Sequence, residues 1–226
     1  MNKGNHIPLI IFDMDGLMFD TETIAIKMWK KVGESFGYDV RPSHIIETLG
    51  IDAVGTKKIL EKHFGKEFPF QKMRTLREEY ALKHIEENGI PVKDGLYELL
   101  DFLEDNRIKK AIATSSERKK VEKFLSFANI KNRFDCIVCG DEITNGKPEP
   151  EIFLKVAQKT GFNSDGCFVL EDSESGIIAA SRAGMKPVFI KDIKGLSKST
   201  EKLIFKEFDS LLKTKDYFES VWSENI

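Results

Sequence analysis

The order of hydrophobic and polar positions along the chain predicts alternating strands and helices with one long helical interruption. The first apolar run, Ile7–Phe12, is short and continuous and leads into Asp and Gly residues, which is typical of a strand buried on both faces. From Thr21 onward, apolar residues recur at three- and four-residue steps as far as Phe36, and Gly37 follows as a stop signal. This spacing predicts an amphipathic helix directly after the first strand.

Residues 21–90 have helical and polar character throughout. After the first helix, helical stretches are expected at Ile45–Leu49, Thr56–Phe64 and Lys72–Glu87. No strand pattern occurs between Thr21 and Pro91, and the turn-forming residues from Asn88 to Pro91 indicate a linker. The segment 21–90 therefore reads as an all-helical insert.

Beyond the linker, helices and strands alternate regularly. Helices are predicted at Leu96–Asp105, Arg118–Ala128, Glu151–Thr160 and Gly176–Ala183. Strands are predicted at Lys110–Ala113, Phe134–Val138, Cys167–Leu170 and Pro187–Ile190. This alternation indicates an α/β fold with a parallel sheet covered on both faces, to which the first strand also belongs. The expected organisation is a core domain of residues 1–20 and 91–226 with a helical domain of residues 21–90 inserted into it. In the lysine-rich segment Lys191–Lys202 we expect a solvated loop and helix face.

Length and charge narrow the class of protein. The 226 residues suit one domain with a large insertion. Lys and Arg number 35 against 37 for Asp and Glu, so the net charge of −2 provides no field to hold nucleic acid. The apolar run at the start is far below the ~18 residues of a membrane-spanning helix, and the first residues lack a secretory cleavage signal. We expect a cytoplasmic protein that binds neither nucleic acid nor membrane, and the sequence leaves the oligomeric state open.

The three cysteines do not indicate a disulfide framework. Cys136 and Cys139 have the spacing of a metal or redox pair, but no second cysteine or histidine pair lies nearby. Both lie in an apolar, strand-like run, where cysteine is an ordinary small hydrophobic residue. We therefore interpret them as packing residues.

Residues capable of chemistry gather just after the predicted strands. They are Asp13, Asp15 and Gly16 after the first strand, Thr114, Ser115 and Ser116 after the second, and Glu171, Asp172 and Ser173 after the fourth. Lys147 lies in the turn before the predicted helix Glu151–Thr160, which precedes the fourth strand. Ligands of open parallel sheets bind outside the carboxyl ends of the strands. We therefore expect these side chains to share one site.

This combination of residues fits a divalent cation and a phosphate. Several carboxylates in one place repel each other, and a hard cation with oxygen ligands relieves the repulsion. Magnesium is the expected ion, with Asp13 and Asp172 as direct ligands and Glu171 nearby. Thr114 and Lys147, together with the backbone N–H groups of Ser115 and Ser116 at the expected start of a helix, would bind the phosphate of a small phosphorylated metabolite.

A carboxylate next to a bound phosphate suggests phosphoryl transfer through an aspartyl phosphate. Repulsion between Asp13 and the phosphate amounts to about 4 kcal/mol per unit pair at ~4 Å with an effective dielectric near 20, and magnesium and Lys147 would offset it. Asp15 would protonate the leaving alkoxide and then activate water. Taken singly, each of these motifs is more often a turn or a helix cap. Their occurrence at the same end of consecutive strand–helix units favours a common site.

Four ordered motifs resemble those of the haloacid dehalogenase superfamily. They are FDMDGLMFDTE at residues 12–22, ATSS at 113–116, GKPEPEIF at 146–153 and LEDSESG at 170–176. The sequence is most similar to the beta-phosphoglucomutase-like subgroup, in which a helical cap is inserted after the first strand. The resemblance implies a Rossmann-like parallel sheet core with a mobile cap at about 21–90 that excludes water and selects the substrate. Its hinges would lie near Phe19–Thr21 and Asn88–Val92.

The resemblance also implies a role for each matched residue. Asp13 would be the nucleophile and a metal ligand, and Asp15 the acid/base, binding the metal through its backbone carbonyl. Thr114 and Lys147 would hold the phosphoryl group. Asp172 would complete the metal site, and Glu171 would bind the ion directly or through water.

Two departures within the superfamily separate the possible activities. True dehalogenases lack the second acid, so Asp15 argues against dehalogenation. Beta-phosphoglucomutases carry a histidine five residues after the acid that corresponds to Asp20, where this chain has Ala25. The sequence therefore favours a magnesium-dependent phosphatase of a small phosphorylated metabolite such as a sugar phosphate. A hexose-phosphate mutase and a non-catalytic phosphate-binding regulatory module are the alternatives.

Overall fold

A computed structural model describes residues 8–222 of the chain, so Ile7, the first residue of the predicted strand, lies outside the described residues. The chain divides into two compact units. The larger unit combines the part of the chain up to Phe19 with the part from Val92 onward. The smaller unit is Asp20–Pro91. These boundaries lie one residue from the expected ones. That the helical unit acts as a mobile cap stays a prediction.

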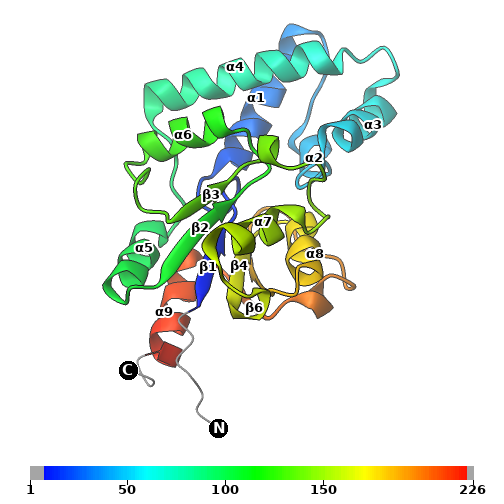
Figure 1. Cartoon of the computed structure of the whole chain (residues 1–226). Coiled ribbons are helices and arrows are strands. Elements are labelled where there is room, and N and C mark those ends of the chain that lie inside the picture. The colour runs from blue at the N-terminus through cyan, green and yellow to red at the C-terminus, as the bar shows by residue number, and fades with distance from the viewer. Residues whose placement is uncertain (1–7, 223–226) are drawn as a thin grey trace. The chain divides into compact units, whose positions relative to one another are not determined.

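The larger unit contains a parallel sheet (Figure 1). Its strands are β1 (Leu9–Phe12), β2 (Lys109–Ala113), β3 (Cys136–Val138), β4 (Cys167–Glu171), β5 (Lys186–Ile190) and β6 (Lys206–Phe208). Their order is β3-β2-β1-β4-β5-β6, and every neighbouring pair is parallel. The predicted α/β fold with a parallel sheet is confirmed, and β1 lies at its centre between β2 and β4.

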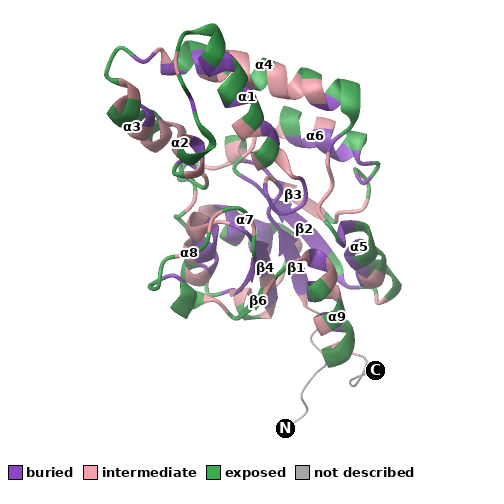
Figure 2. Cartoon of the chain, turned by 180° about the vertical axis from the view of Figure 1, so that it is seen from behind, coloured by how far each residue is buried: buried purple, intermediate pink, exposed green. Residues whose placement is uncertain are grey.

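Helices cover both faces of this sheet (Figure 1). They are α5 (Leu96–Asp105), α6 (Arg118–Phe127), α7 (Glu151–Thr160), α8 (Glu174–Arg182) and α9 (Leu211–Trp222), with short 3-10 helices η1 (Gly140–Glu142), η2 (Ser164–Gly166) and η3 (Glu201–Leu203). On one face, Leu9 and Ile11 of β1 share a core with Phe153 of α7 and Ala180 of α8. On the other face, Phe168 of β4 packs against Phe218 of α9, with ring centroids 5.6 Å apart. The continuous apolar run of β1 follows from this double cover, and all of its residues are fully buried (Figure 2).

The helical unit lies in sequence between β1 and β2 and has its own hydrophobic core. Its helices are α1 (Thr21–Ser35), α2 (Pro42–Ile46), α3 (Ala53–Phe64) and α4 (Phe70–Asn88). Trp29 of α1 stacks on Phe70 of α4, with ring centroids 6.0 Å apart, and Leu60 and Met73 are fully buried beside them. The side chain of Asp20 caps α1 by accepting a hydrogen bond from the Thr23 N–H.

Two parts of the chain differ from the sequence-based expectation. Helix α2 begins at Pro42 and ends at Ile46, earlier than the predicted Ile45–Leu49, because a proline in the first turn is preorganised for a helix start. Of the solvated loop and helix face expected within Lys191–Lys202, the structure has mostly the loop, since helical structure begins only with η3 at Glu201. Beyond it, β6 and α9 were not anticipated.

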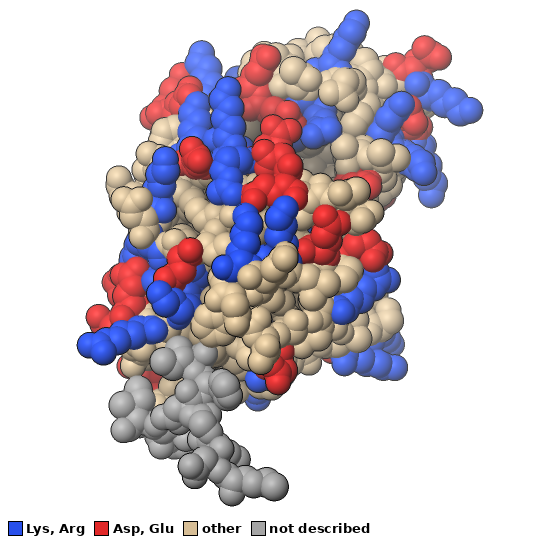
Figure 3. Space-filling view, viewed as in Figure 1, with Lys and Arg blue, Asp and Glu red and all other residues tan. Residues whose placement is uncertain are grey.

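The remaining sequence expectations concern the charge of the surface, membrane-spanning helices and the cysteines. On the face drawn in Figure 3, positive and negative side chains are interspersed. Within residues 8–222, none of the helices is sufficiently long and apolar to cross a bilayer. Cys139 is buried directly after β3, and burial raises the pKa of its thiol to about 11, so the thiol stays protonated at neutral pH.

Candidate active site

The carboxyl edge of the sheet brings three acidic side chains together. Phe12 is paired with Leu170 in the β1–β4 register, and the N–H of Asp13 donates a 3.1 Å hydrogen bond to the Leu170 carbonyl. Asp13 therefore lies beside Glu171, the last residue of β4, and Asp172, which follows it. Carboxylate oxygens of these three buried residues all lie within 4.8 Å of one another. Sequence segments separated by more than 150 residues thus form one acidic cluster.

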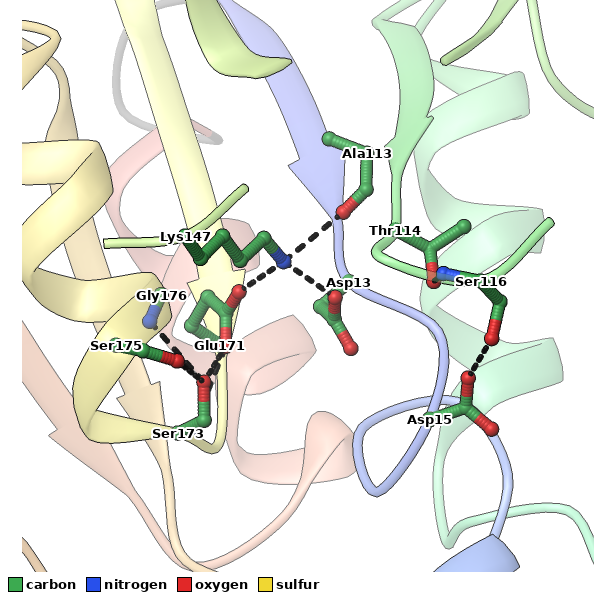
Figure 4. A network of polar contacts seen from close by, with 10 residues as sticks. All are labelled: Asp13, Asp15, Ala113, Thr114, Ser116, Lys147, Glu171, Ser173, Ser175 and Gly176. Atoms are coloured by element: carbon green, nitrogen blue, oxygen red, sulfur yellow. Dashed lines mark hydrogen bonds and ion pairs between the residues drawn. The ribbon is translucent and has the colours of Figure 1, made fainter. Parts of the chain in front are cut away.

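Lys147 provides the positive charge of this cluster. Its Nζ lies 2.5 Å from Oδ1 of Asp13 and 2.5 Å from Oε1 of Glu171, and it donates a 3.1 Å hydrogen bond to the Ala113 carbonyl (Figure 4). The lysine side chain is only 5% exposed. One ammonium group beside three carboxylates leaves the cluster with an excess of negative charge when all are ionised.

The pKa values of Asp13 and Lys147 are both raised. Burial raises the pKa of Asp13 to about 7, the Lys147 ammonium opposes the rise, and the negative charge of Glu171 adds to it. Burial alone would lower the pKa of Lys147, but the carboxylates of Asp13 and Glu171 raise it above its usual value. Lys147 is therefore charged at neutral pH, and a further cation in the cluster would favour the ionised form of Asp13.

The chain around the cluster is built to hold the acids closely. Oε2 of Glu171 accepts hydrogen bonds from the N–H and the hydroxyl of Ser173, at 3.3 and 2.9 Å. Gly16 has a φ of +83°, and a Cβ on it would lie 2.2 Å from Oδ2 of Asp172. Only glycine meets both conditions, so the turn after β1 can approach Asp172. The sequence shows this glycine, but its contact with Asp172 is visible only in the fold.

The Thr114–Ser116 turn, which the sequence predicts to bind phosphate, directly follows β2. Thr114 is 1% exposed, and its Oγ1 accepts a 3.1 Å hydrogen bond from the Ser116 N–H. Helix α6 begins only at Arg118. Ser115 and Ser116 therefore lie in the turn before the helix, whereas the sequence suggested that they lie at its start. The N–H of Ser116 is thus already engaged within the turn. The hydroxyl group of Thr114 can also act as a donor, so it could donate to a ligand.

Asp15 lies beside this turn and outside the acidic cluster. Its Oδ2 accepts a 2.6 Å hydrogen bond from the Ser116 hydroxyl (Figure 4), and its Oδ1 accepts a 2.8 Å hydrogen bond from Nζ of Lys120. Sequence reasoning missed Lys120. The available signal was its position four residues after Ser116, in the first turn of α6, from where a long side chain can reach back. The predicted metal contact through the backbone carbonyl of Asp15 stays a prediction.

The acidic cluster fits a metal ion by the chemistry of its donors. Asp13, Glu171 and Asp172 offer hard oxygen ligands, all buried and close enough to share one ion. Their excess negative charge requires compensation that Lys147 alone does not supply. The cluster could therefore bind a divalent metal ion.

Comparison with known proteins identifies relatives that match most of the chain. The sequence model of the haloacid dehalogenase-like hydrolases matches residues 10–190, a range that includes the acidic cluster, Asp15, Lys147 and the Thr114–Ser116 turn. A phosphorylated carbohydrates phosphatase of Thermotoga maritima is 32% identical over 190 residues, covering 80% of this chain and 83% of the relative. The fructose-1-phosphate phosphatase YqaB of Escherichia coli is 29% identical over 186 residues, covering 80% and 95% of the two chains.

A solved structure shows the same architecture. The crystal structure of beta-phosphoglucomutase from Clostridium difficile superposes with a TM-score of 0.77 at 26% identity, covering 97% of this chain and 98% of the other. The similarity extends over both the sheet unit and the helical unit. The helical segment α1–α4 between β1 and β2 is therefore consistent with an inserted cap.

Proposed function

The chain belongs to the haloacid dehalogenase-like hydrolases and is a hydrolase of the phosphatase type, and from this premise we propose that it is a magnesium-dependent phosphatase of small phosphorylated carbohydrates. One observation carries the proposal: Asp13 lies in contact with Lys147 and within reach of Glu171 and Asp172. A nucleophile, a fixed cation and further oxygen ligands are thus combined in one buried place. Asp15, two residues further on, adds an acid beside the phosphate-binding turn.

In the first half-reaction, a carboxylate oxygen of Asp13 attacks the phosphorus of the monoester. An oxygen–phosphorus bond forms to Asp13 while the bond from phosphorus to the alkoxide oxygen breaks. Asp15 donates its proton to that oxygen, so the carbohydrate leaves as the alcohol. Lys147 and the hydroxyl of Thr114 bind phosphoryl oxygens and offset the negative charge of the transferring group.

In the second half-reaction, Asp15 acts as a base. Its carboxylate accepts a proton from a water molecule whose oxygen attacks the phosphorus of the aspartyl phosphate. The bond between phosphorus and the Asp13 oxygen breaks, and inorganic phosphate leaves. Asp13 returns as a carboxylate and Asp15 as the acid, so the cycle closes without net consumption of a side chain.

Asp13, Glu171 and Asp172 would hold the magnesium ion. The donor set of buried carboxylates fits its preference for hard oxygen ligands with positions left for water and phosphate. When bound, the ion would neutralise charge on the phosphoryl oxygens and so reduce their repulsion of Asp13.

The substrate class is supported by the relatives. A phosphatase of phosphorylated carbohydrates and a fructose-1-phosphate phosphatase match most of the chain at 32% and 29% identity. A hexitol phosphatase B of Escherichia coli is 26% identical over 206 residues. A sugar or sugar-alcohol phosphate is therefore the class to test first.

The test is release of inorganic phosphate from p-nitrophenyl phosphate and a panel of sugar phosphates, with magnesium or with EDTA. The Asp13→Asn variant should lose at least about 1,000-fold in turnover, because the amide is a poor nucleophile. The matched control is Asp105→Asn, at an exposed acid at the end of α5. Turnover by Asp13→Asn at the wild-type rate, or turnover unaffected by EDTA, would contradict the proposal.

The structural similarity to a beta-phosphoglucomutase makes the hexose-phosphate mutase the second candidate. The same panel separates the two activities. Isomerised hexose phosphate without released inorganic phosphate would replace the phosphatase by the mutase. Ala25, at the position where the mutases carry a histidine, is the reason that we place the phosphatase first.

A further inference from the structure

Asp15 is held by two donors that also contact each other. The Ser116 hydroxyl donates to Oδ2 at 2.6 Å, and Nζ of Lys120 donates to Oδ1 at 2.8 Å. Nζ of Lys120 also donates to Oγ of Ser116 at 3.0 Å. Each oxygen of the Asp15 carboxylate thus accepts a hydrogen bond, and rotation of the carboxylate would break at least one of them.

Lys120 is itself anchored on the side of α6 that meets the Asp15–Phe19 turn. Its Nζ lies 5.1 Å from the centre of the Phe124 ring, one helical turn further along α6. Phe124 is 4% exposed and packs edge-on against the fully buried Phe19, with ring centroids 6.1 Å apart. The N–H of Gly16 donates to the Phe19 carbonyl at 2.9 Å, which closes the turn that carries Asp15. The lysine and the turn are therefore attached to the same buried aromatic pair.

The hydrogen bond from the Ser116 hydroxyl also connects Asp15 to the Thr114–Ser116 turn. Ser116, which donates its hydroxyl to Asp15, donates its N–H to Oγ1 of Thr114 at 3.1 Å. The backbone of the Thr114–Ser116 segment also packs closely against Gly140. A Cβ on this glycine would lie 2.2 Å from the Ser115 carbonyl oxygen. The position of the Asp15 carboxylate relative to Thr114 is thus determined by a short chain of contacts.

We propose that Lys120 is the positioning residue of Asp15: it holds the carboxylate at the phosphate-binding turn, so that the proton of Asp15 reaches the leaving oxygen of the substrate. The inference rests on the proposed function, in which Asp15 is the acid/base. Lys120 acts through Asp15 and does not itself touch the reacting atoms. Its side chain is 44% exposed, and exposed ion pairs contribute little to folding, so its value lies in alignment.

The reaction offers a readout that a merely structural role would not move. A sugar phosphate expels an alkoxide, which requires a proton, whereas p-nitrophenyl phosphate expels a weakly basic phenolate, which does not. The kcat/KM value reports the steps up to formation of the aspartyl phosphate, in which this proton is transferred. Misplacing the acid should therefore slow the first substrate far more than the second.

The experiment compares Lys120→Ala, Lys120→Arg and the exposed neighbour Lys119→Ala, using p-nitrophenyl phosphate and the sugar phosphate that the wild type hydrolyses fastest. We expect Lys120→Ala to lower kcat/KM for the sugar phosphate by about 10- to 100-fold and that for p-nitrophenyl phosphate by less than about 3-fold. Lys120→Arg should restore most of the loss, since it keeps the positive charge and the donors. Lys119→Ala should resemble the wild type, and none of these variants should shift the unfolding midpoint appreciably.

Three results would overturn the inference: equal losses with both substrates, no loss with either, or faster turnover by Lys120→Ala. Asp15→Asn separates its failure from that of the proposed function. If Asp15→Asn is inactive on the sugar phosphate while Lys120→Ala is unaffected, only the role of Lys120 is wrong. If Asp15→Asn retains full turnover, or the wild type has none, the proposed function fails and the role of Lys120 with it.

Discussion

Gly176 lies so close to Glu171 that a Cβ built on this glycine would be 1.9 Å from the carboxylate carbon. Gly176 is buried in the first turn of α8, and its N–H donates to Oγ of Ser173 at 3.1 Å. The same hydroxyl donates to Glu171. The fully buried carboxylate of Glu171 is therefore held between a serine and the bare backbone of a helix.

Replacing this glycine by alanine should disturb the acidic cluster. Intrinsic helix propensity favours alanine by up to about 1 kcal/mol, but the added methyl group must displace the Glu171 carboxylate, and such overpacking costs about 1–3 kcal/mol. We expect Gly176→Ala to be less stable towards urea and to need about 10- to 100-fold more magnesium for half-maximal activity. Gly166→Ala is the control, because a Cβ there meets nothing within 4 Å. A Gly176→Ala protein with wild-type stability and magnesium dependence would show that Glu171 can move without consequence.

The C-terminal helix offers a second test of close packing. Gly95, which caps α5, has a φ of +82°, and a Cβ on it would lie 2.0 Å from the backbone nitrogen of Leu212 in α9. Gly161 at the end of α7 has a similar backbone conformation, with a φ of +76°, but a Cβ there meets nothing within 4 Å. We expect Gly161→Ala to cost about 1–2 kcal/mol from backbone strain alone. Gly95→Ala should cost a further 1–3 kcal/mol, roughly, because α9 must shift.

Chemical denaturation of the two variants measures this difference directly. Equal losses of unfolding free energy would mean that the contact between the α5 cap and α9 adds nothing to stability. A greater loss for Gly161→Ala would contradict the close approach of Leu212 to Gly95.

The arrangement of the acidic cluster was accessible from the sequence because topology alone imposes it. Strands separated by helices are parallel, so residues that follow β1, β2 and β4 reach the same edge of the sheet. That rule brings Asp13, Glu171 and Asp172 together without knowledge of any side-chain contact. Lys147 was found through its place in the turn before α7.

The parts that sequence reasoning missed depend on tertiary contacts. Strand β6 contains one apolar residue, Phe208, and is an edge strand, so it has no hydrophobic pattern to detect. In α9, the fully buried Thr214 lies between Leu211 and Phe218 and interrupts the apolar spacing of the buried face. The roles of Gly16 and Gly176 result from side chains that they lack. Such roles become visible only when the neighbouring carboxylates are placed.

A prediction on pH concerns Glu104 of α5, far in the sequence from the acidic cluster. Its two oxygens accept hydrogen bonds from Nε and an Nη of Arg133, at 2.9 and 2.7 Å, and Nζ of Lys110 lies 3.1 Å away. The hydrogen bonds from Arg133 lower the pKa of Glu104 to about 2. Between its ordinary pKa of 4.5 and this value, the folded chain binds fewer protons at Glu104 than the unfolded chain. Its contribution to stability is thus complete above pH 4.5 and is lost as pH falls towards 2.

Glu104→Gln should remove this contribution. Because the Glu104 side chain is 41% exposed, we discount for solvent screening and expect a loss of about 1 kcal/mol at neutral pH. The difference from the wild type should shrink as pH falls from 4.5 towards 2, which unfolding curves at several pH values would measure. The exposed Glu98 on the same helix supplies the control variant Glu98→Gln. A difference between Glu104→Gln and the wild type that does not change with pH would contradict the assigned pKa shift.

The last prediction tests metal binding without a rate measurement. An ion that binds only the folded chain stabilises it by about 2.7 kcal/mol at a concentration 100 times its Kd, so magnesium should raise the unfolding midpoint of the wild type, and EDTA should reverse the effect. Asp172→Asn removes one of the three clustered carboxylates and should abolish most of this gain. In EDTA, however, the same variant should be at least as stable as the wild type, since it relieves repulsion within a buried cluster of like charges. The Asp105→Asn control should respond to magnesium as the wild type does. A full magnesium response in Asp172→Asn would mean that the ion binds elsewhere, whereas a large loss of stability in EDTA would assign Asp172 a structural role that is independent of metal.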